Sequence, residues 1–179
     1  DFDDVLEMLV DDGIIRRDQI EDVKRYTLYD ISELARSTEN RLPSHWRPVI
    51  NEFAWPVPNV YTVTSLFGSR IDPITFDVSY HNGVDIGAPD GTPVLAAKEG
   101  KVISSGYLGT AGNAVIIKHD QDMETRYYHL SKILVKAGEK VKQNQKIGEV
   151  GSTGRSTGPH LHFEIRVGGT PIDPLRYFE

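Results

Sequence analysis

Cysteine is absent from the 179 residues of this sequence. The absence excludes disulfides, thiolate zinc sites and cysteine nucleophiles. Any bound metal must therefore be held by histidine and carboxylate side chains. The absence of cysteine does not show in which redox compartment the protein works, because an exported protein can fold without disulfides.

Two further features are missing. No apolar run approaches the roughly 18 residues of a membrane span, and no clustered basic patch indicates nucleic-acid binding. The chain begins at Asp1, without a methionine and without a charged and then apolar signal segment. We expect a processed or trimmed form whose targeting segment is not part of this chain.

The net charge of −6 is distributed unevenly. Residues 1–40 hold 12 acidic and 5 basic side chains, whereas residues 41–179 are nearly balanced. Hydrophobic residues at helical spacing predict two short amphipathic helices in the acidic part, one ending at Gly13 and one beginning at Asp18. Their apolar positions are Phe2, Val5, Leu6 and Leu9, and then Ile20, Val23, Ile31 and Leu34.

A proline-rich interval follows the predicted helices and marks a linker. It contains Pro43, Pro48, Pro56 and Pro58. From Val60 onward, short apolar runs alternate with turn residues at the spacing typical of barrels and sandwiches. The sequence therefore predicts a helical segment with a linker over residues 1–52 and a mainly β domain over residues 53–179, with an antiparallel, barrel-like sheet.

The stretch GPHLHFEIRV alternates strictly between apolar and polar residues. Leu161, Phe163 and Ile165 fall on one parity, and His160 and His162 fall on the other. Along a strand the two histidines are same-face neighbours roughly 6.5 to 7 Å apart. That spacing suits one metal ligand and one neighbour that reaches toward a metal-bound water.

A second cluster lies in YHNGVDIG, where His81 and Asp85 are four residues apart. In a straight strand they would be separated by ~13 Å. A bend at Asn82 and Gly83 would bring them together. A third histidine, His129, lies in TRYYHLS, where strand alternation predicts that it shares a face with Thr125 and Tyr127.

In chain order, the segments HNGVDIGAPDGTPVLAAKEGKVI, GNAVIIKHD, RYYHLS, GEKVKQNQKIGEVGSTGRSTGPHLHFEI and IDPLRYF resemble the lysostaphin-type (LytM-like) zinc endopeptidases that cut peptidoglycan peptides. The resemblance covers roughly residues 56–179. It implies one zinc ion per chain, with the metal ligands at His81, Asp85 and His162. It places the two non-ligand histidines at His129 and His160.

The same resemblance implies that His129 and His160 act on the water, the oxyanion or the leaving amine, without assigning which does which. Some relatives use an additional tyrosine, and Tyr80, Tyr127 and Tyr128 are near in sequence without matching that role. His45 and His119 are expected to be structural.

The implied substrate is a peptidoglycan peptide in a strand-lined groove, with GSTGRSTGP as one wall, and the implied site of action is extracytoplasmic. We expect loops such as residues 69–79 to determine specificity. A glycyl-glycine bridge, a D-alanyl-diaminopimelate cross-link and a glycyl-D-alanine bond all remain candidates, and the sequence does not define the oligomeric state.

Three alternatives remain. Two histidines and a carboxylate also form the iron(II) site of non-haem oxygenases. The fold could instead bind peptidoglycan, or activate an amidase, without catalysis. The run VKAGEKVKQNQKIGEVGSTG is similar to lipoyl and biotinyl carrier hairpins, but the carrier lysine turn is absent.

Overall fold

The fold is described by a computed structural model that covers residues 2–13, 16–19, 41–71 and 75–179. The first predicted helix is confirmed as α1 (Phe2–Asp11), and a short 3-10 helix, η1 (Arg17–Gln19), follows it. Asp18 lies within η1 and pairs with Arg16 at 3.0 Å. The rest of the second predicted helix lies outside the described residues. No helix in the described part of the chain is long and apolar enough to cross a membrane.

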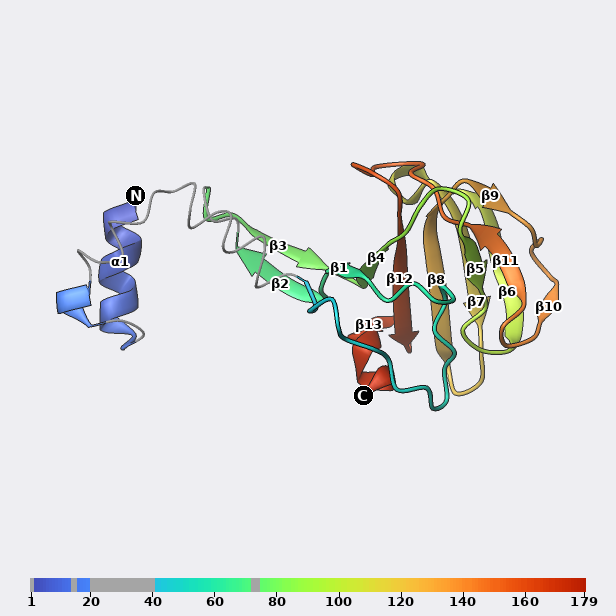
Figure 1. The fold of residues 1–179 in the computed structure, drawn as a ribbon, viewed down its shortest axis with the longest axis horizontal. Coiled ribbons are helices and arrows are strands. Elements are labelled where there is room, and N and C mark those ends of the chain that lie inside the picture. Colours follow the sequence, from blue (N-terminus) through green and yellow to red (C-terminus); the bar gives the residue numbers. More distant parts are fainter. Residues whose placement is uncertain (1, 14–15, 20–40, 72–74) are drawn as a thin grey trace.

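Strands make up most of the remaining chain (Figure 1). Their bounds are β1 (Val63–Ser65), β2 (Gly68–Ile71), β3 (Val78–His81), β4 (Val84–Gly87), β5 (Pro93–Leu95), β6 (Gly100–Tyr107), β7 (Asn113–Lys118), β8 (Met123–Leu130), β9 (Lys132–Ile133), β10 (Lys140–Val141), β11 (Lys146–Glu149), β12 (His160–Val167) and β13 (Thr170–Ile172). Two 3-10 helices complete the set, η2 (Gly109–Ala111) and η3 (Pro174–Phe178).

The largest sheet runs in the order β1, β4, β12, β8, β7, β6 and β10, with β13 paired to β12. A three-stranded sheet has the order β5, β11 and β9, and β2 pairs with β3. The strand pairs are antiparallel, which confirms the predicted fold class. The described strands do not close into a barrel, because β1 and the two-residue β10 stand at opposite edges of the large sheet.

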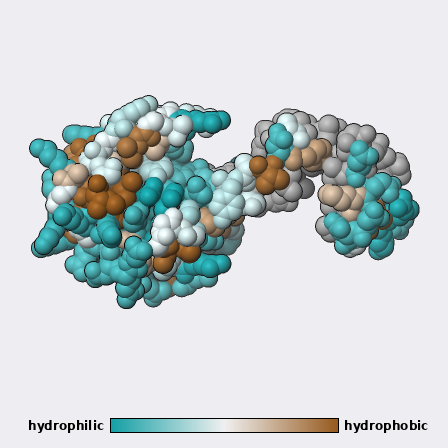
Figure 2. Space-filling view, turned by 180° about the vertical axis from the view of Figure 1, so that it is seen from behind, coloured by the Kyte–Doolittle hydropathy of each residue, from teal (hydrophilic) through white to brown (hydrophobic). Residues whose placement is uncertain are grey.

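One hydrophobic core joins the large sheet and the three-stranded sheet. It contains Val94 and Ile147 from the small sheet and Val115, Ile117 and Phe163 from the large one, all fully buried. On the face seen in Figure 2, hydrophilic side chains predominate and the apolar patches are separated by polar residues. Most apolar side chains of the strands are thus buried in the core.

The segment before β1 packs on the β domain. Leu42 and Trp46 contact the core, and the Trp46 and Trp55 rings lie 5.4 Å apart between centroids. The Leu42 amide donates to the Val63 carbonyl at 3.1 Å, and the Val49 amide donates to the Phe178 carbonyl at 2.8 Å. The proline-rich interval is therefore bound along the domain from residue 42 onward.

The β2–β3 hairpin was not anticipated by strand patterning. It extends away from the large sheet in Figure 1, and its Gly68–His81 end lies at the start of β4. Residues 69–71 and 78–79, at the two ends of the segment expected to be a loop, thus belong to two paired strands. The hairpin ends in His81, so its base is part of the candidate site.

Candidate active site

The bend between β3 and β4 brings His81 close to Asp85. His81 Nε2 lies 3.2 Å from Asp85 Oδ1, which confirms the predicted turn at Asn82 and Gly83. A Cβ atom at Gly83 would lie 2.3 Å from the Phe163 carbonyl oxygen on β12. Glycine is therefore required here, since any side chain would push β4 away from its neighbour.

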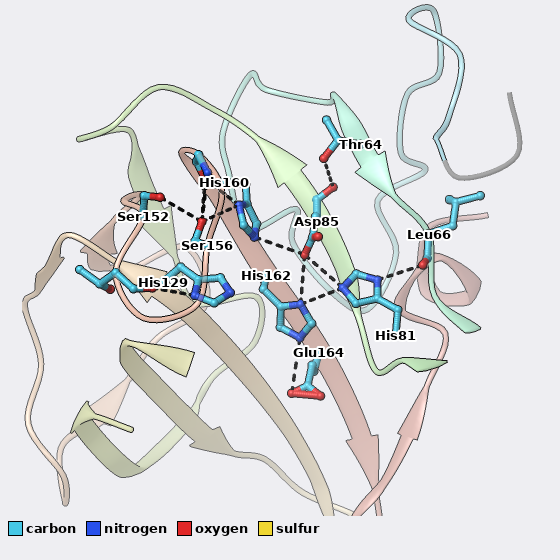
Figure 3. Close-up of polar contacts among 12 residues, drawn as sticks. Thr64, Leu66, His81, Asp85, His129, Ser152, Ser156, His160, His162 and Glu164 are labelled. Carbon is cyan, nitrogen blue, oxygen red and sulfur yellow. Dashed lines mark hydrogen bonds and ion pairs between the residues drawn. The ribbon is translucent and has the colours of Figure 1, made fainter. Parts of the chain in front are cut away.

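Strand β12 places the third donor opposite Asp85. Its register with β4 pairs His162 with Asp85 and His160 with Gly87. Leu161, Phe163 and Ile165 are buried in the core, which confirms the predicted apolar face. Both histidines therefore lie on the opposite face, as Figure 3 shows.

Three donor atoms meet at one point between these strands (Figure 3). His162 Nδ1 lies 3.0 Å from Asp85 Oδ1 and 3.1 Å from His81 Nε2. In a tetrahedral zinc site with bonds of about 2.0 Å, neighbouring donors stand roughly 3.3 Å apart. The triangle fits such a site closely, so His81, Asp85 and His162 form a group that could hold a metal ion.

A hydrogen bond from Nδ1 to the backbone orients the His81 ring. His81 Nδ1 lies 2.9 Å from the Leu66 carbonyl oxygen, which can only accept a hydrogen bond. The proton is therefore on Nδ1, and the lone pair on Nε2 faces the other donors. A metal ligand needs this tautomer.

The carboxylate and the imidazoles perturb each other strongly. Burial raises the pKa of Asp85, but the close imidazoles of His162 and His81 outweigh it and hold that pKa well below its usual range. Burial lowers the pKa of His162, whereas Asp85 and Glu164 raise it to about 9. Asp85 is thus ionised and available as an anionic ligand.

His160 and His129 stand beside this group. His160 Nε2 is 3.6 Å from Asp85 Oδ1, and the His160 and His129 ring centroids are 4.8 Å apart. His160 Nδ1 lies 2.8 Å from the Gly158 carbonyl, and His129 Nδ1 lies 2.8 Å from the Thr153 carbonyl. Each Nδ1 is therefore a donor to the backbone, and each Nε2 is left as a proton acceptor.

The predicted face of His129 is wrong. Thr125 and Tyr127 point into the core and are hydrogen-bonded to each other, whereas His129 lies against His160. His129 has a left-handed φ of 65°, and the β7–β8 register shifts between Asn113 and Val115. This irregularity breaks the alternation and turns His129 to the other face. Burial lowers the pKa of its imidazole.

A groove of about 800 Å³ surrounds these residues. Tyr80, Tyr128 and Arg155 line it, together with Ser156 and Thr157. The predicted wall is confirmed, and it is braced by hydrogen bonds between Ser152 and Ser156 and from the Arg155 amide to the Thr110 carbonyl.

Tyr127 and His119 lie outside the groove. The Tyr127 hydroxyl accepts from the Ala97 amide, and burial raises its pKa to about 12. His119 lies 2.6 Å from the Glu99 carbonyl and 2.8 Å from the Thr125 hydroxyl. His119 therefore has a structural role, as predicted.

Sequence reasoning missed Glu164. It shares the polar parity of β12 with the two histidines, yet it is only 1% exposed. The sequence did contain a signal for it, a carboxylate two residues after the second histidine of H-x-H. Same-face neighbours on a strand lie close together, so this spacing places Glu164 next to His162.

Comparison with known proteins defines the class. Peptidase family M23 matches residues 79–174, and the chain belongs to this family. The resemblance to lysostaphin-type peptidases is thereby confirmed, and the iron oxygenase alternative is disfavoured.

Named relatives agree with this assignment. The chain is 46% identical over 123 residues to the peptidoglycan DD-endopeptidase ShyA of Vibrio cholerae, covering 68% of this chain and 29% of that protein. A zinc containing peptidase from Vibrio cholerae has a TM-score of 0.64 and 45% identity over 71% of this chain and 39% of that one. Lysostaphin from Staphylococcus simulans has a TM-score of 0.53 and 40% identity over 55% and 43% of the two chains. The chain thus spans less than a third of the length of its curated relative ShyA.

Proposed function

We propose that this chain is a zinc-dependent endopeptidase that hydrolyses peptide bonds in the cross-bridges or stem peptides of bacterial peptidoglycan. The convergence of His81 Nε2, Asp85 Oδ1 and His162 Nδ1 within 3.2 Å of one another carries the proposal. Membership of Peptidase family M23 supports it. Because peptidoglycan lies outside the cytoplasmic membrane, the proposed site of action is extracytoplasmic.

His81, Asp85 and His162 would hold the zinc ion, which would supply a Lewis acid and a water whose pKa is lowered toward about 7. His129 and His160 flank the donors, with Nδ1 of each committed to a backbone carbonyl. One imidazole takes a proton from the attacking water through Nε2. The imidazolium formed in this way can donate its Nε2 proton to the developing oxyanion and then to the leaving amine. The open groove suits an extended peptide held largely by backbone contacts.

The identity of the metal is the first test. We expect about one zinc ion per chain, loss of peptidase activity after chelation, and recovery on adding one equivalent of zinc. Elemental analysis and a peptidoglycan digestion assay provide the measurements. Iron as the bound metal, together with turnover of 2-oxoglutarate, would support the oxygenase reading. Full zinc with no digestion would support a binding module.

The division at residues 52 and 53 is a proposal about domain independence. A chain beginning at Arg41 should fold, bind zinc and cut peptidoglycan. The three metal donors and the residues that contact them all lie after residue 41 in the sequence. A chain beginning at Phe53 loses the packing of Leu42 and Trp46 and should melt about 5 to 10 °C lower. Thermal unfolding and zinc content test both chains.

Failure of the Arg41 chain to fold or to hold zinc would show that the N-terminal segment belongs to the same unit. Faster digestion by this chain than by the full chain would show that the removed segment is inhibitory.

A further inference from the structure

Glu164 lies behind the metal-facing edge of His162, on the same face of β12. Its side chain is 1% exposed, and Arg166 donates to its Oε1 at 3.0 Å. Its other oxygen, Oε2, is buried, and no donor among the described residues lies within hydrogen-bond distance of it. A buried carboxylate oxygen without a donor is costly. His162 Nε2 lies 3.8 Å from this oxygen and can donate to it (Figure 3).

Tyr128 restricts the His162 ring from a second direction. The two rings are stacked with centroids 5.1 Å apart and an interplanar angle of 15°. Stacking fixes the plane of the imidazole, but it does not distinguish one nitrogen from the other. In the neutral ring that binds a metal, a separate contact must decide which nitrogen carries the proton.

We propose that Glu164 is a positioning residue that accepts the Nε2 proton of His162 and thereby keeps the Nδ1 lone pair on the metal. The inference rests on the proposed zinc site and adds a residue to it. The Leu66 carbonyl plays the corresponding part for His81. Arg166 holds Glu164 in place through Oε1, which leaves Oε2 for His162.

Glu164→Gln tests the role with little change of volume. An amide oxygen that accepts from Arg166 turns its NH2 group toward His162 Nε2. That arrangement favours the proton on Nδ1, the tautomer that cannot bind a cation through Nδ1. Competition with a chromophoric chelator should show zinc affinity about 10 to 100-fold weaker. The zinc-free variant should melt close to the unaltered protein.

Glu124→Gln is the matched control, because Glu124 pairs with Arg126 across the same two-residue spacing at 3.0 Å. It should leave zinc affinity unchanged. An affinity of Glu164→Gln within twofold of the unaltered chain would overturn the proposal.

Nitrogen-15 spectra of the unaltered, zinc-loaded chain give a readout that does not depend on a variant. The His162 proton is expected on Nε2, and a proton on Nδ1 would overturn the proposal even if Glu164→Gln fails to fold. An unaltered chain that takes up no zinc would overturn both the proposed function and this inference. Normal zinc uptake and digestion with an unaffected Glu164→Gln would overturn this inference alone.

Discussion

Replacing His162 by alanine is expected to leave the purified protein nearly free of zinc and at least ~10³-fold less active, because the metal supplies several kcal/mol of transition-state stabilisation. Its Nδ1 is one corner of a triangle whose sides are 3.0 to 3.2 Å. His81→Ala and Asp85→Ala should behave in the same way. Zinc content by elemental analysis and digestion rates measure the two effects.

The control for these variants is His45→Ala. His45 is exposed in the segment before β1 and should be replaced without loss of zinc or activity. Circular dichroism should show the same strand content in every variant, since the core lies on the other face of β12. A His81→Ala or Asp85→Ala protein with one full equivalent of zinc would contradict the ligand assignment.

The second large effect separates the two non-ligand histidines from the ligands. His129→Ala and His160→Ala should retain near-stoichiometric zinc while losing about 10²–10⁴-fold in turnover, the usual contribution of a general acid or base. Their Nδ1 atoms bond to the carbonyls of Thr153 and Gly158, outside the donor triangle. The measurement is kcat alongside zinc content.

The double variant should lose less than the product of the two single losses, because both residues serve one proton path. If the His160→Ala variant lacked zinc and the His162→Ala variant retained it, His160 would be the metal ligand and the assignment within H-x-H would be wrong.

Local patterning predicted the parts of the site that depend on single strands. The alternation of residues 160–167 placed His160 and His162 on one face, and the Asn82-Gly83 turn placed His81 next to Asp85. Both features follow from chain geometry within a few residues. The pairing of β12 with β4, which brings the two clusters together, is a long-range contact that the resemblance implied and periodicity did not.

Features that depend on partner strands were not predicted from periodicity. His129 changes face because the β7–β8 register shifts, and a register is a property of two strands rather than one. Glu164 is buried because Arg166 and His162 surround its carboxylate, although its type predicts exposure. The packing of Leu42 and Trp46 also reflects contacts made far along the chain.

The products of peptidoglycan digestion test the central claim most directly. Sacculi of defined cross-bridge chemistry should be incubated with the zinc-loaded chain, with and without chelator, and the fragments identified by mass spectrometry. The expected result is conversion of cross-linked peptides into fragments with one new amino terminus and one new carboxyl terminus, with glycan strands intact and no conversion in chelator. Intact peptides after incubation with fully zinc-loaded protein, or cleavage confined to the glycan strands, would contradict it.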